Sequence, residues 1–227
     1  MIVDRVRKRL GTSAVLTSLA VFCLAATLVG LAGSVVMESP VMEHGIAAEK
    51  AGKTGGEFWI FAEKSDLHAI RSIISERSRG FSPEVTSLLA EVILDESIRY
   101  GLDPALILAI IETESSFRNW SRSNRDARGL MQILPTTGEA VARKIDIAWE
   151  GEASLYLPVV NIRVGTYYFS ELVARFDSVE LALAAYNRGP NAVKRIIGRG
   201  HLPSGRYSRK VLSSYRRLRP RFSPHAS

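Results

Sequence analysis

The feature that most constrains the fold of this chain is a series of helix-period segments between residues 82 and 218. The first opens at Ser82-Pro83-Glu84, which combines an N-cap, a proline at the first helical position and an early acid, and it stops at Gly101. No alternating strand pattern of useful length occurs, although the loop after residue 115 has room for a short hairpin. We therefore expect an all-α fold, or α+β at most by a small hairpin, with helices at 82–100, 103–115, 136–145, 158–176, 178–187, 191–197 and 207–218.

A long uncharged segment lies near the N-terminus. Residues 10–37 contain no charged residue, and residues 14–37 exceed the roughly 20 apolar residues that cross a bilayer. Four basic residues and one acid precede them, which places residues 1–13 in the cytoplasm and the rest of the chain outside. The alternative is a cleaved signal sequence, whose apolar core is normally about 7–15 residues. The length of the segment favours a retained transmembrane anchor.

The only cysteine, Cys23, lies in the middle of this segment and is interpreted as a small apolar filler. The exported part therefore has no disulfide and no thiol nucleophile. Next come a polar, glycine-containing stretch and an amphipathic helix at 57–79, which is either close to the membrane or, as we favour, docked on the domain. The expected boundaries are a linker and helix at 38–80, a folded domain at 81–220 and a tail at 221–227.

Positive charge is concentrated toward the C-terminus. The chain has 30 Lys and Arg and 23 Asp and Glu, and residues 181–227 contain 11 of the basic residues and no acid. Such a region either forms a solvated helix face or suits an anionic partner. Export argues against nucleic acid, so the functional alternative is attraction to an anionic cell wall or membrane surface.

Glu114 continues the apolar face of a hydrophobic helix. The stripe contains Ile107, Ile110 and Ile111, which lie seven, four and three residues before the acid. A carboxylate on such a face is costly in its charged form, and the C-terminal end of the helix dipole acts in the same direction, so we expect a raised pKa. A Glu that keeps its proton near neutral pH is what a general acid requires.

The alternative for Glu114 is that its side chain bends out into water at the last helical turn. Glu112 lies two positions away and therefore points to the other side of the helix. We expect Glu112 to be a solvated surface charge.

Three short motifs follow in order along the chain. They are Glu114-Ser115-Ser116-Phe117, then Gly129-Leu130-Met131-Gln132-Ile133-Leu134-Pro135-Thr136-Thr137, then Ala185-Tyr186-Asn187-Arg188-Gly189-Pro190. Together they resemble the soluble-type lytic transglycosylases (SLT), which belong to the lysozyme-like superfamily and are related to goose-type lysozymes. The resemblance covers about half of the chain and implies that residues 81–220 form a lysozyme-like helical SLT domain.

The resemblance implies a peptidoglycan lytic transglycosylase that uses one carboxylate. Glu114 would protonate the glycosidic oxygen between MurNAc and GlcNAc, and would then act as base for the sugar's own 6-hydroxyl, which closes a 1,6-anhydro ring. Glycoside hydrolysis usually needs two carboxylates, whereas this route needs neither a second one nor water, and no cofactor is implied. The four histidines lack metal-ligand spacing.

The implied partners are peptidoglycan glycan strands and, through the N-terminal segment, the bacterial membrane. We therefore expect the chain in the bacterial cell envelope, with the catalytic domain facing the periplasm or exterior, or secreted if the N-terminus is cleaved. Nucleic acid is not an expected partner.

Asp126 leaves two classes of mechanism open. The family usually has glycine at this point of the loop, and an aspartate tolerates a left-handed turn almost as glycine does. The other interpretation is a second carboxylate that activates water, which would make the enzyme a hydrolase like a goose-type lysozyme. A third class is a non-catalytic cell-wall-binding or assembly module, against which the retention of Glu114, Gln132 and Tyr186 argues.

The resemblance also implies substrate contacts around the acid. Ser115 would hydrogen-bond the sugar near the cleavage point, or would simply be a polar residue at a helix end. Met131 and Gln132 match a pair that lines the cleft; Gln132 offers a donor and an acceptor to N-acetyl groups, whereas Met131 alone would more often be core.

Two tyrosines and one asparagine complete the expected site. Tyr186 lies on an apolar helix, where a tyrosine is usually a core residue, but the resemblance places its hydroxyl near Glu114, where it would orient the acid. Asn187 would support the chain turn or the sugar, and Tyr207 would line the cleft. Before Tyr207 this chain has Ser204-Gly205-Arg206 in place of the Glu-Thr pair that the family often carries. We interpret Asn161 mainly as a helix-packing residue.

Overall fold

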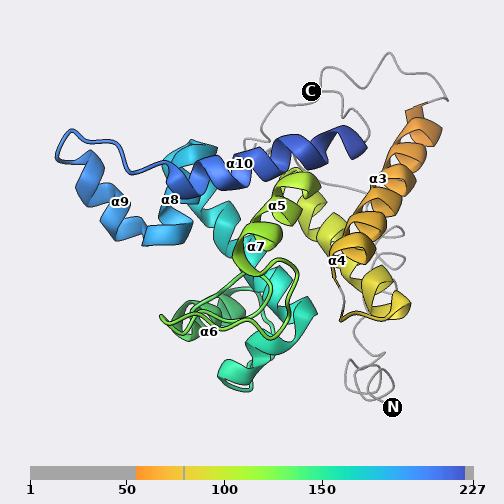
Figure 1. The fold of residues 1–227 in the computed structure, drawn as a ribbon, viewed down its shortest axis with the longest axis horizontal. Coiled ribbons are helices and arrows are strands. Elements are labelled where there is room, and N and C mark those ends of the chain that lie inside the picture. Colours follow the sequence, from red (N-terminus) through yellow and green to blue (C-terminus); the bar gives the residue numbers. More distant parts are fainter. Residues whose placement is uncertain (1–54, 79, 223–227) are drawn as a thin grey trace, which may run out of the picture. The chain divides into compact units, whose positions relative to one another are not determined.

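Helices make up all the regular secondary structure in residues 55–78 and 80–222, the part of the chain that the computed structural model describes (Figure 1). The expected cytoplasmic segment 1–13, the anchor or signal sequence at 14–37, the linker as far as residue 54 and residues 223–227 of the tail lie outside the described residues. Within the described ranges, no helix is long and apolar enough to cross a membrane.

The all-α prediction is confirmed for the described residues, which form no β-strand. Two isolated bridges, Arg122 with Arg128 and Arg128 with Ile133, stand where a hairpin could have formed. From α4 onward the α-helices begin and end within one residue of the predicted positions, but the short η2 was not predicted. The elements are α3 (Gly55–Arg77), α4 (Pro83–Tyr100), α5 (Pro104–Ser115), α6 (Pro135–Lys144), η2 (Glu152–Tyr156), α7 (Pro158–Phe176), α8 (Val179–Arg188), α9 (Pro190–Ile197), α10 (Arg206–Leu218) and η3 (Arg219–Arg221).

The helix-capping residues that the sequence predicted are found at both ends of α4 and at the start of α5. The Ser82 hydroxyl accepts a hydrogen bond from the Val85 N–H, and Gly101 ends α4 in the left-handed conformation with φ 61°. The carboxylate of Asp103 caps α5 by accepting from the Ala105 N–H at 2.8 Å. These local signals fix where α5 begins, and therefore where its far end lies.

The helix α5 is the buried centre of the fold. Its residues 105–111 are apolar on every side and are at most 7% exposed. A helix of this kind is stable only when other helices surround it. It packs against α10 and α4, and α7 in turn packs against α4 and α8. Tertiary contacts with these helices therefore hold the last turn of α5 in place.

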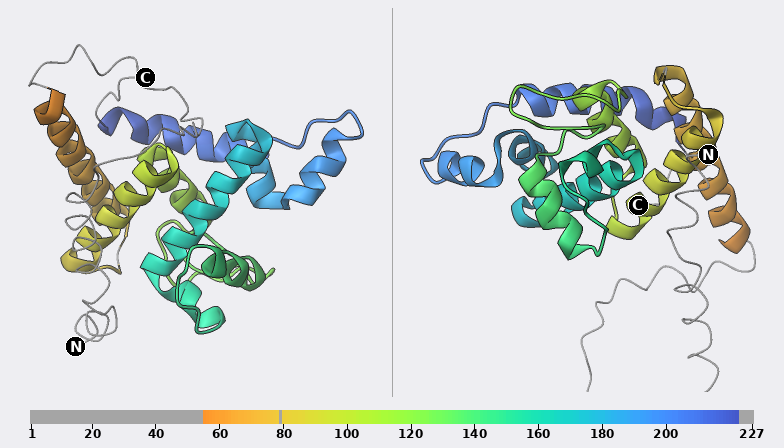
Figure 2. Two further views of the ribbon diagram at one scale, coloured as in Figure 1. Left: turned by 180° about the vertical axis from the view of Figure 1, so that it is seen from behind. Right: turned by 90° about the horizontal axis from the view of Figure 1, so that it is seen from below.

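The helix α3 is docked on the rest of the described fold. Ala69, Ile70, Ile73 and Ile74 are buried, and α3 lies against α4 in both views of Figure 2. Each buried aliphatic side chain contributes about 1.5–3 kcal/mol of transfer free energy. The predicted amphipathic helix thus uses its apolar face for packing within the fold.

Glu112 is not the solvated surface charge that the sequence suggested. Its carboxylate forms ion pairs with Arg77 of α3 and, at 2.9 Å, with Arg217 of α10, and it accepts a hydrogen bond from Ser214. The helical spacing correctly turned Glu112 away from Glu114. What the spacing did not reveal is that two further helices cover that side of α5.

Candidate active site

Glu114 occupies the last turn of α5, where its side chain is half-buried. The helix ends at Ser115, because the next residue, Ser116, adopts the left-handed conformation with φ 52° and donates its N–H to the Glu112 carbonyl. The Tyr207 hydroxyl, from α10, donates to Oε1 of Glu114 at 2.6 Å. The acid is therefore fixed by two helices that are far apart in the sequence.

The pKa of Glu114 is raised, as the sequence predicts. Burial is the main cause, since it disfavours the charged carboxylate. The hydrogen bond from Tyr207 and the nearby positive charge of Lys210 both lower the pKa, but burial outweighs them. Lys210 is held beside the acid, because its Nζ donates to the Thr113 carbonyl at 3.3 Å.

Tyr186 lies near the acid, as the resemblance implies, but its hydroxyl does not bond to Glu114. Its hydroxyl donates to the Met131 carbonyl at 2.8 Å, while Tyr207 donates to Glu114. The ring of Tyr186 packs 5.6 Å from that of Tyr168, centre to centre. Burial is the main cause of its strongly raised pKa, and the charge of Glu114 raises that pKa further. Tyr186 thus lies near the acid and links α8 to the loop that faces it.

Asn161 holds that loop in place, which is more than the helix packing expected of it. Its side chain is fully buried; Oδ1 accepts from the Met131 N–H at 2.7 Å, and Nδ2 donates to the carbonyls of Arg128 and Leu155, both at 2.9 Å. Gly129 lies against it with φ 78°, and a Cβ there would come within 2.3 Å of Nδ2 of Asn161. The glycine is required both by its backbone conformation and by this close approach.

Met131 and Gln132 both serve the loop itself. The Met131 side chain is fully buried against Gly165, so it does not line an open cleft. The amide nitrogen of Gln132 donates to the carbonyls of Ser121 and Gly129, at 3.1 and 3.0 Å. Its Oε1 accepts no hydrogen bond from the described residues. Of the donor and the acceptor that were expected to bind N-acetyl groups, only the acceptor is therefore available to a substrate.

A cavity of about 760 Å³ borders Tyr207 on the side of α8 and α10. It is lined by Asn187, Arg188, Ser204, Arg206, Tyr207 and Lys210. Tyr207 and Lys210 are also the two residues that lower the pKa of Glu114, although Glu114 itself is not among the residues that line the cavity. Asn187 and Tyr207, both predicted to contact substrate, therefore face the same space.

Sequence and structure comparisons agree on a single family. The family model described as Transglycosylase SLT domain matches residues 91–203, which include Glu114, the loop at 129–132 and Tyr186. Residues 91–203 form a transglycosylase SLT domain. The predicted boundaries at 81 and 220 stay a prediction.

Two named relatives are similar to part of this chain and are themselves longer. Membrane-bound lytic murein transglycosylase C of Actinobacillus pleuropneumoniae serotype 5b is 36% identical over 135 residues, which are 54% of this chain and 34% of that protein. The transglycosylase of Enterobacteria phage PRD1 is 35% identical over 101 residues, or 44% of this chain and 35% of that protein. The chain thus spans about a third of the length of these relatives.

A solved structure supports the fold. An inactive glutamate-to-glutamine mutant of lytic transglycosylase Slt from Pseudomonas aeruginosa matches 74% of this chain and 30% of its own, with 28% identity and a TM-score of 0.53. The fold of about three quarters of this chain is therefore similar to part of this lytic transglycosylase.

Ser115 and Asp126 are placed in structural positions in this SLT domain. Ser115 is 1% exposed and donates to the Ile111 carbonyl at 3.2 Å, as a polar residue at a helix end does. Asp126 has φ 66°, the left-handed conformation expected if it stands in for glycine. Arg122 donates to its Oδ1 at 2.6 Å and Arg128 at 3.0 Å, and these hydrogen bonds, chiefly that from Arg128, lower its pKa.

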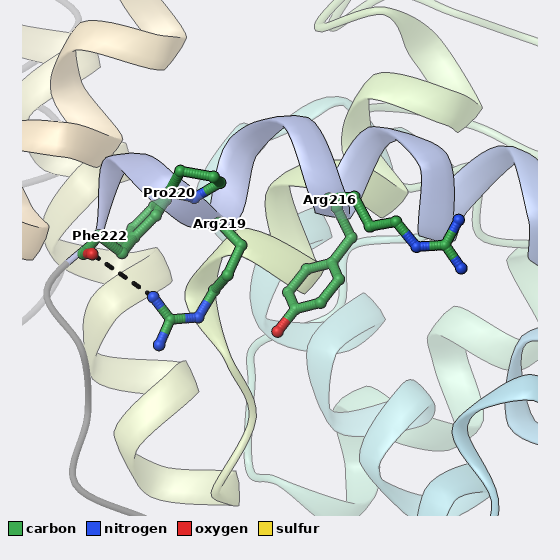
Figure 3. Close-up of a pocket in the computed structure, with 5 residues that line it drawn as sticks. Arg216, Arg219, Pro220 and Phe222 are labelled. Carbon is green, nitrogen blue, oxygen red and sulfur yellow. Dashed lines mark hydrogen bonds between the residues drawn. The ribbon is translucent and has the colours of Figure 1, made fainter.

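A second cavity lies at the other end of α5. It measures about 450 Å³ and is lined by Tyr215, Arg216, Arg219, Pro220 and Phe222 (Figure 3). The Tyr215 hydroxyl donates to Asp103, the N-cap of α5, at 2.8 Å. Asp103 and Glu114 are eleven residues apart along the helix, or about 16 Å. This cavity is therefore remote from the acid of the SLT domain.

Sequence reasoning missed two features of the site, the hydrogen bond from Tyr207 to Glu114 and the loop-holding function of Asn161. Asn161 carried a detectable signal, because a polar amide stands beside apolar residues on the buried face of α7. The Tyr207 contact had no such signal, since it joins residues 93 positions apart. In the described residues, no group of three or more His, Cys, Asp or Glu lies close enough to hold a metal ion.

Proposed function

We propose that this chain is a peptidoglycan lytic transglycosylase that cleaves the MurNAc–GlcNAc β-1,4 bond and leaves a 1,6-anhydroMurNAc end. The observation that carries the proposal is Glu114, a half-buried acid of the SLT domain with a raised pKa, which accepts a 2.6 Å hydrogen bond from Tyr207. A raised pKa keeps the proton on the acid at the pH where it must be donated.

Glu114 acts twice in this mechanism. It first donates its proton to the glycosidic oxygen, and the C1–O4 bond breaks. The resulting carboxylate then takes the proton of the 6-hydroxyl of the MurNAc sugar that holds C1. The 6-oxygen bonds to C1 and closes the 1,6-anhydro ring. Tyr207 and Lys210 stabilise the carboxylate between the two transfers, because a hydrogen-bond donor and a positive charge both favour the ionised form.

The surroundings of Asp126 favour this route over hydrolysis. A base that activates water needs a pKa near the working pH, whereas the two arginines hold the pKa of Asp126 below its usual range. Its left-handed backbone already accounts for an aspartate in place of glycine. We therefore assign Asp126 to the loop and leave the chemistry to Glu114.

The names of the relatives support a proposal for the substrate and the location. Several of the matched proteins are named membrane-bound lytic murein transglycosylase C, and another is named a putative soluble lytic murein transglycosylase. We propose glycan strands of peptidoglycan as the substrate, the cell envelope as the location, and residues 14–37 as the membrane anchor. Gln132 through Oε1, Asn187 and Tyr207 are the proposed substrate contacts, while Ser115, Met131 and Tyr186 support the site from within the fold.

The decisive experiment compares Glu114→Gln with Glu112→Gln in the 227-residue chain. Digestion of purified peptidoglycan, followed by mass spectrometry of the products, reports anhydro ends separately from reducing ends. Glu114→Gln removes the proton donor, and we expect product release to fall by about 10²–10⁴-fold. The inactive Pseudomonas aeruginosa Slt mutant carries the same kind of substitution.

Glu112→Gln is the matched control on the same helix. It weakens the contacts to α3 and α10, so it is expected to lower the thermal stability while the chain still releases anhydro ends. Equal activity of Glu114→Gln and wild type would overturn the assignment of the acid. Release of reducing ends alone would replace the transglycosylase with a hydrolase.

A further inference from the structure

Trp120 is an exposed aromatic residue in the loop between α5 and α6, six positions after Glu114. It is 76% exposed, whereas every other aromatic residue in 64–78 and 80–222 is buried or half-buried. Tryptophan is the largest side chain and is highly buried on average, because its apolar surface is costly to leave in water. The position of this indole in solvent therefore calls for an explanation.

The indole of Trp120 lies flat on the ring of Tyr156. The two ring centres are 5.2 Å apart and their planes differ by 30°, which is a stacked arrangement. Tyr156 is the last residue of η2, and its carbonyl accepts a hydrogen bond from Nδ2 of Asn119 at 2.8 Å. One face of the indole is thus covered by Tyr156, and the opposite face is open to solvent. A ring supported in this way presents a rigid apolar surface.

Tyr156 is itself supported from within the fold. The guanidinium of Arg128 lies over the Tyr156 ring, 5.8 Å from its centre, where the ring's negative face attracts a cation. Arg128 is 5% exposed and is held by ion pairs with Asp126, at 3.0 Å, and Glu152, at 2.7 Å. The base on which Trp120 lies is therefore fixed by buried contacts.

The stacked pair is also joined to the loop that Asn161 holds. Ser121 follows Trp120, and its carbonyl accepts from Nε2 of Gln132 at 3.1 Å and from the Gly129 N–H at 3.0 Å. These bonds give Trp120 a fixed place relative to Gln132. Trp120 lines neither of the two cavities described above, so its surface is separate from them.

The size and surroundings of this surface suit a sugar ring. A pyranose has an apolar C–H face that packs flat on an aromatic ring, and a rim of hydroxyl and acetamido groups that needs polar neighbours. The same loop supplies such neighbours in Arg118, Arg122 and Arg125, which are exposed. One indole among charged residues is too small for a stable protein interface, which covers about 800 Å² on each partner.

We propose that Trp120, supported by Tyr156, forms a stacking platform that binds a sugar ring of the glycan strand. The inference rests on the proposed function, since it takes the glycan strand to be the substrate. The platform recognises the sugar face and not a charge, so it binds strands without peptides. It adds strand affinity from the loop and takes no part in the proton transfers at Glu114.

The test measures binding of peptide-free glycan strands to the Glu114→Gln chain, in which cleavage is slow. The same chain is compared with Trp120→Ala, Trp120→Phe or Ile98→Ala added. Ile98 is 64% exposed on α4, so its variant removes an exposed apolar side chain from another element. The melting temperature of each chain shows that it is folded.

We expect Trp120→Ala to weaken strand binding by about tenfold, since the stacked ring is lost. Trp120→Phe retains most of the affinity, because it keeps an aromatic face, and Ile98→Ala retains all of it. The difference between Trp120→Ala and its parent persists at high salt, which screens the exposed arginines but not a stacking contact. Strand binding also changes the tryptophan emission of the parent chain, and this change is much smaller in Trp120→Phe.

Catalysis provides a second measurement, with Glu114 in place. Trp120→Ala is expected to raise KM for the strands by about tenfold and to leave kcat within about twofold, as loss of binding that is equal in ground and transition states does. A fall in kcat with KM unchanged would instead make Trp120 a support for the loop and would overturn the platform.

The platform is also overturned if Trp120→Ala binds strands as tightly as its parent, or if Ile98→Ala weakens binding equally. The first result would leave the indole to a partner other than a glycan. The proposed function fails separately, if the chain with Glu114 in place releases no anhydro ends. The platform then still stands or falls on the strand binding of the Glu114→Gln chains.

Discussion

Glu114 and Asp126 stand at either side of one turn-rich stretch of chain, but their carboxylates meet opposite surroundings. Glu114 is half-buried at the end of α5 and accepts a hydrogen bond from the neutral Tyr207, whereas Asp126 lies in the loop and is paired with Arg122 and Arg128. Burial raises the pKa of the first, and the arginine hydrogen bonds lower the pKa of the second. In the proposed mechanism, the same functional group is thereby prepared for proton transfer in one region, whereas in the other it fixes a turn.

The largest predicted effect on stability and activity is at Asn161, which holds the loop at 129–132 in place without contacting Glu114. Asn161→Ala removes three buried hydrogen bonds and leaves the partners unsatisfied, so we expect a loss of about 3 kcal/mol or more in the free energy of unfolding, together with most of the activity. Denaturant unfolding measures the first and release of anhydro ends the second. Asn124→Ala, at an exposed position of the same loop, should change the stability by less than about 0.5 kcal/mol.

The next prediction concerns the hydrogen bond from Tyr207 to Glu114, which Tyr207→Phe removes. The hydroxyl favours the ionised carboxylate, so its removal raises the pKa of Glu114 further and moves the loss of activity at alkaline pH to higher pH. The carboxylate intermediate also loses a hydrogen bond, and kcat should fall by about tenfold. A pH profile of kcat tests both effects. Tyr186→Phe is the control. The Tyr186 hydroxyl donates to the Met131 carbonyl, so its removal should leave the loss of activity at alkaline pH where it is in wild type.

Asp126→Gly is expected to leave the chemistry unchanged. Glycine accepts the left-handed conformation at this position, and no step of the proposed route uses the carboxylate. Activity should stay within about threefold of wild type, and the products should still be anhydro ends, as mass spectrometry can show. Loss of activity in Asp126→Gly but not in Asp126→Asn would instead indicate that the backbone conformation of the loop is required. Loss in both variants would support Asp126 as a second catalytic carboxylate.

The smallest predicted effect is a contrast in the pH dependence of stability. The folded pKa of Glu114 is raised, so its ionisation destabilises the fold above the unfolded pKa; Glu114→Gln should raise the melting temperature at pH 7, by about 1–3 °C, and much less at pH 4. The folded pKa of Asp126 is lowered, so its ion pairs stabilise the fold above the unfolded pKa and are lost as the pH falls through the folded one. Asp126→Asn should therefore lower the melting temperature at pH 7, and by less as the pH falls through the folded pKa of Asp126. Equal changes at both pH values would contradict the contrast.

The sequence alone determined the helices and the acid. Caps at Ser82 and Asp103, the stop at Gly101 and the apolar periodicity are local, so they predicted the bounds of α4 and α5 to within one residue. The stripe that ends in Glu114 predicted a raised pKa because burial on that face follows from helical spacing. The exchange of glycine for Asp126 predicted a left-handed turn for the same local reason.

Only the tertiary structure decided which side chains meet the acid. The sequence favoured Tyr186, but packing of α10 on α5 brings Tyr207 to Glu114, while Tyr186 holds Met131 from α8. Packing of α3 and α10 likewise turned Glu112 from an expected surface charge into an ion-paired residue. Spacing along one helix fixes the direction of a side chain, but its partners come from distant segments, whose approach depends on how all the helices pack together.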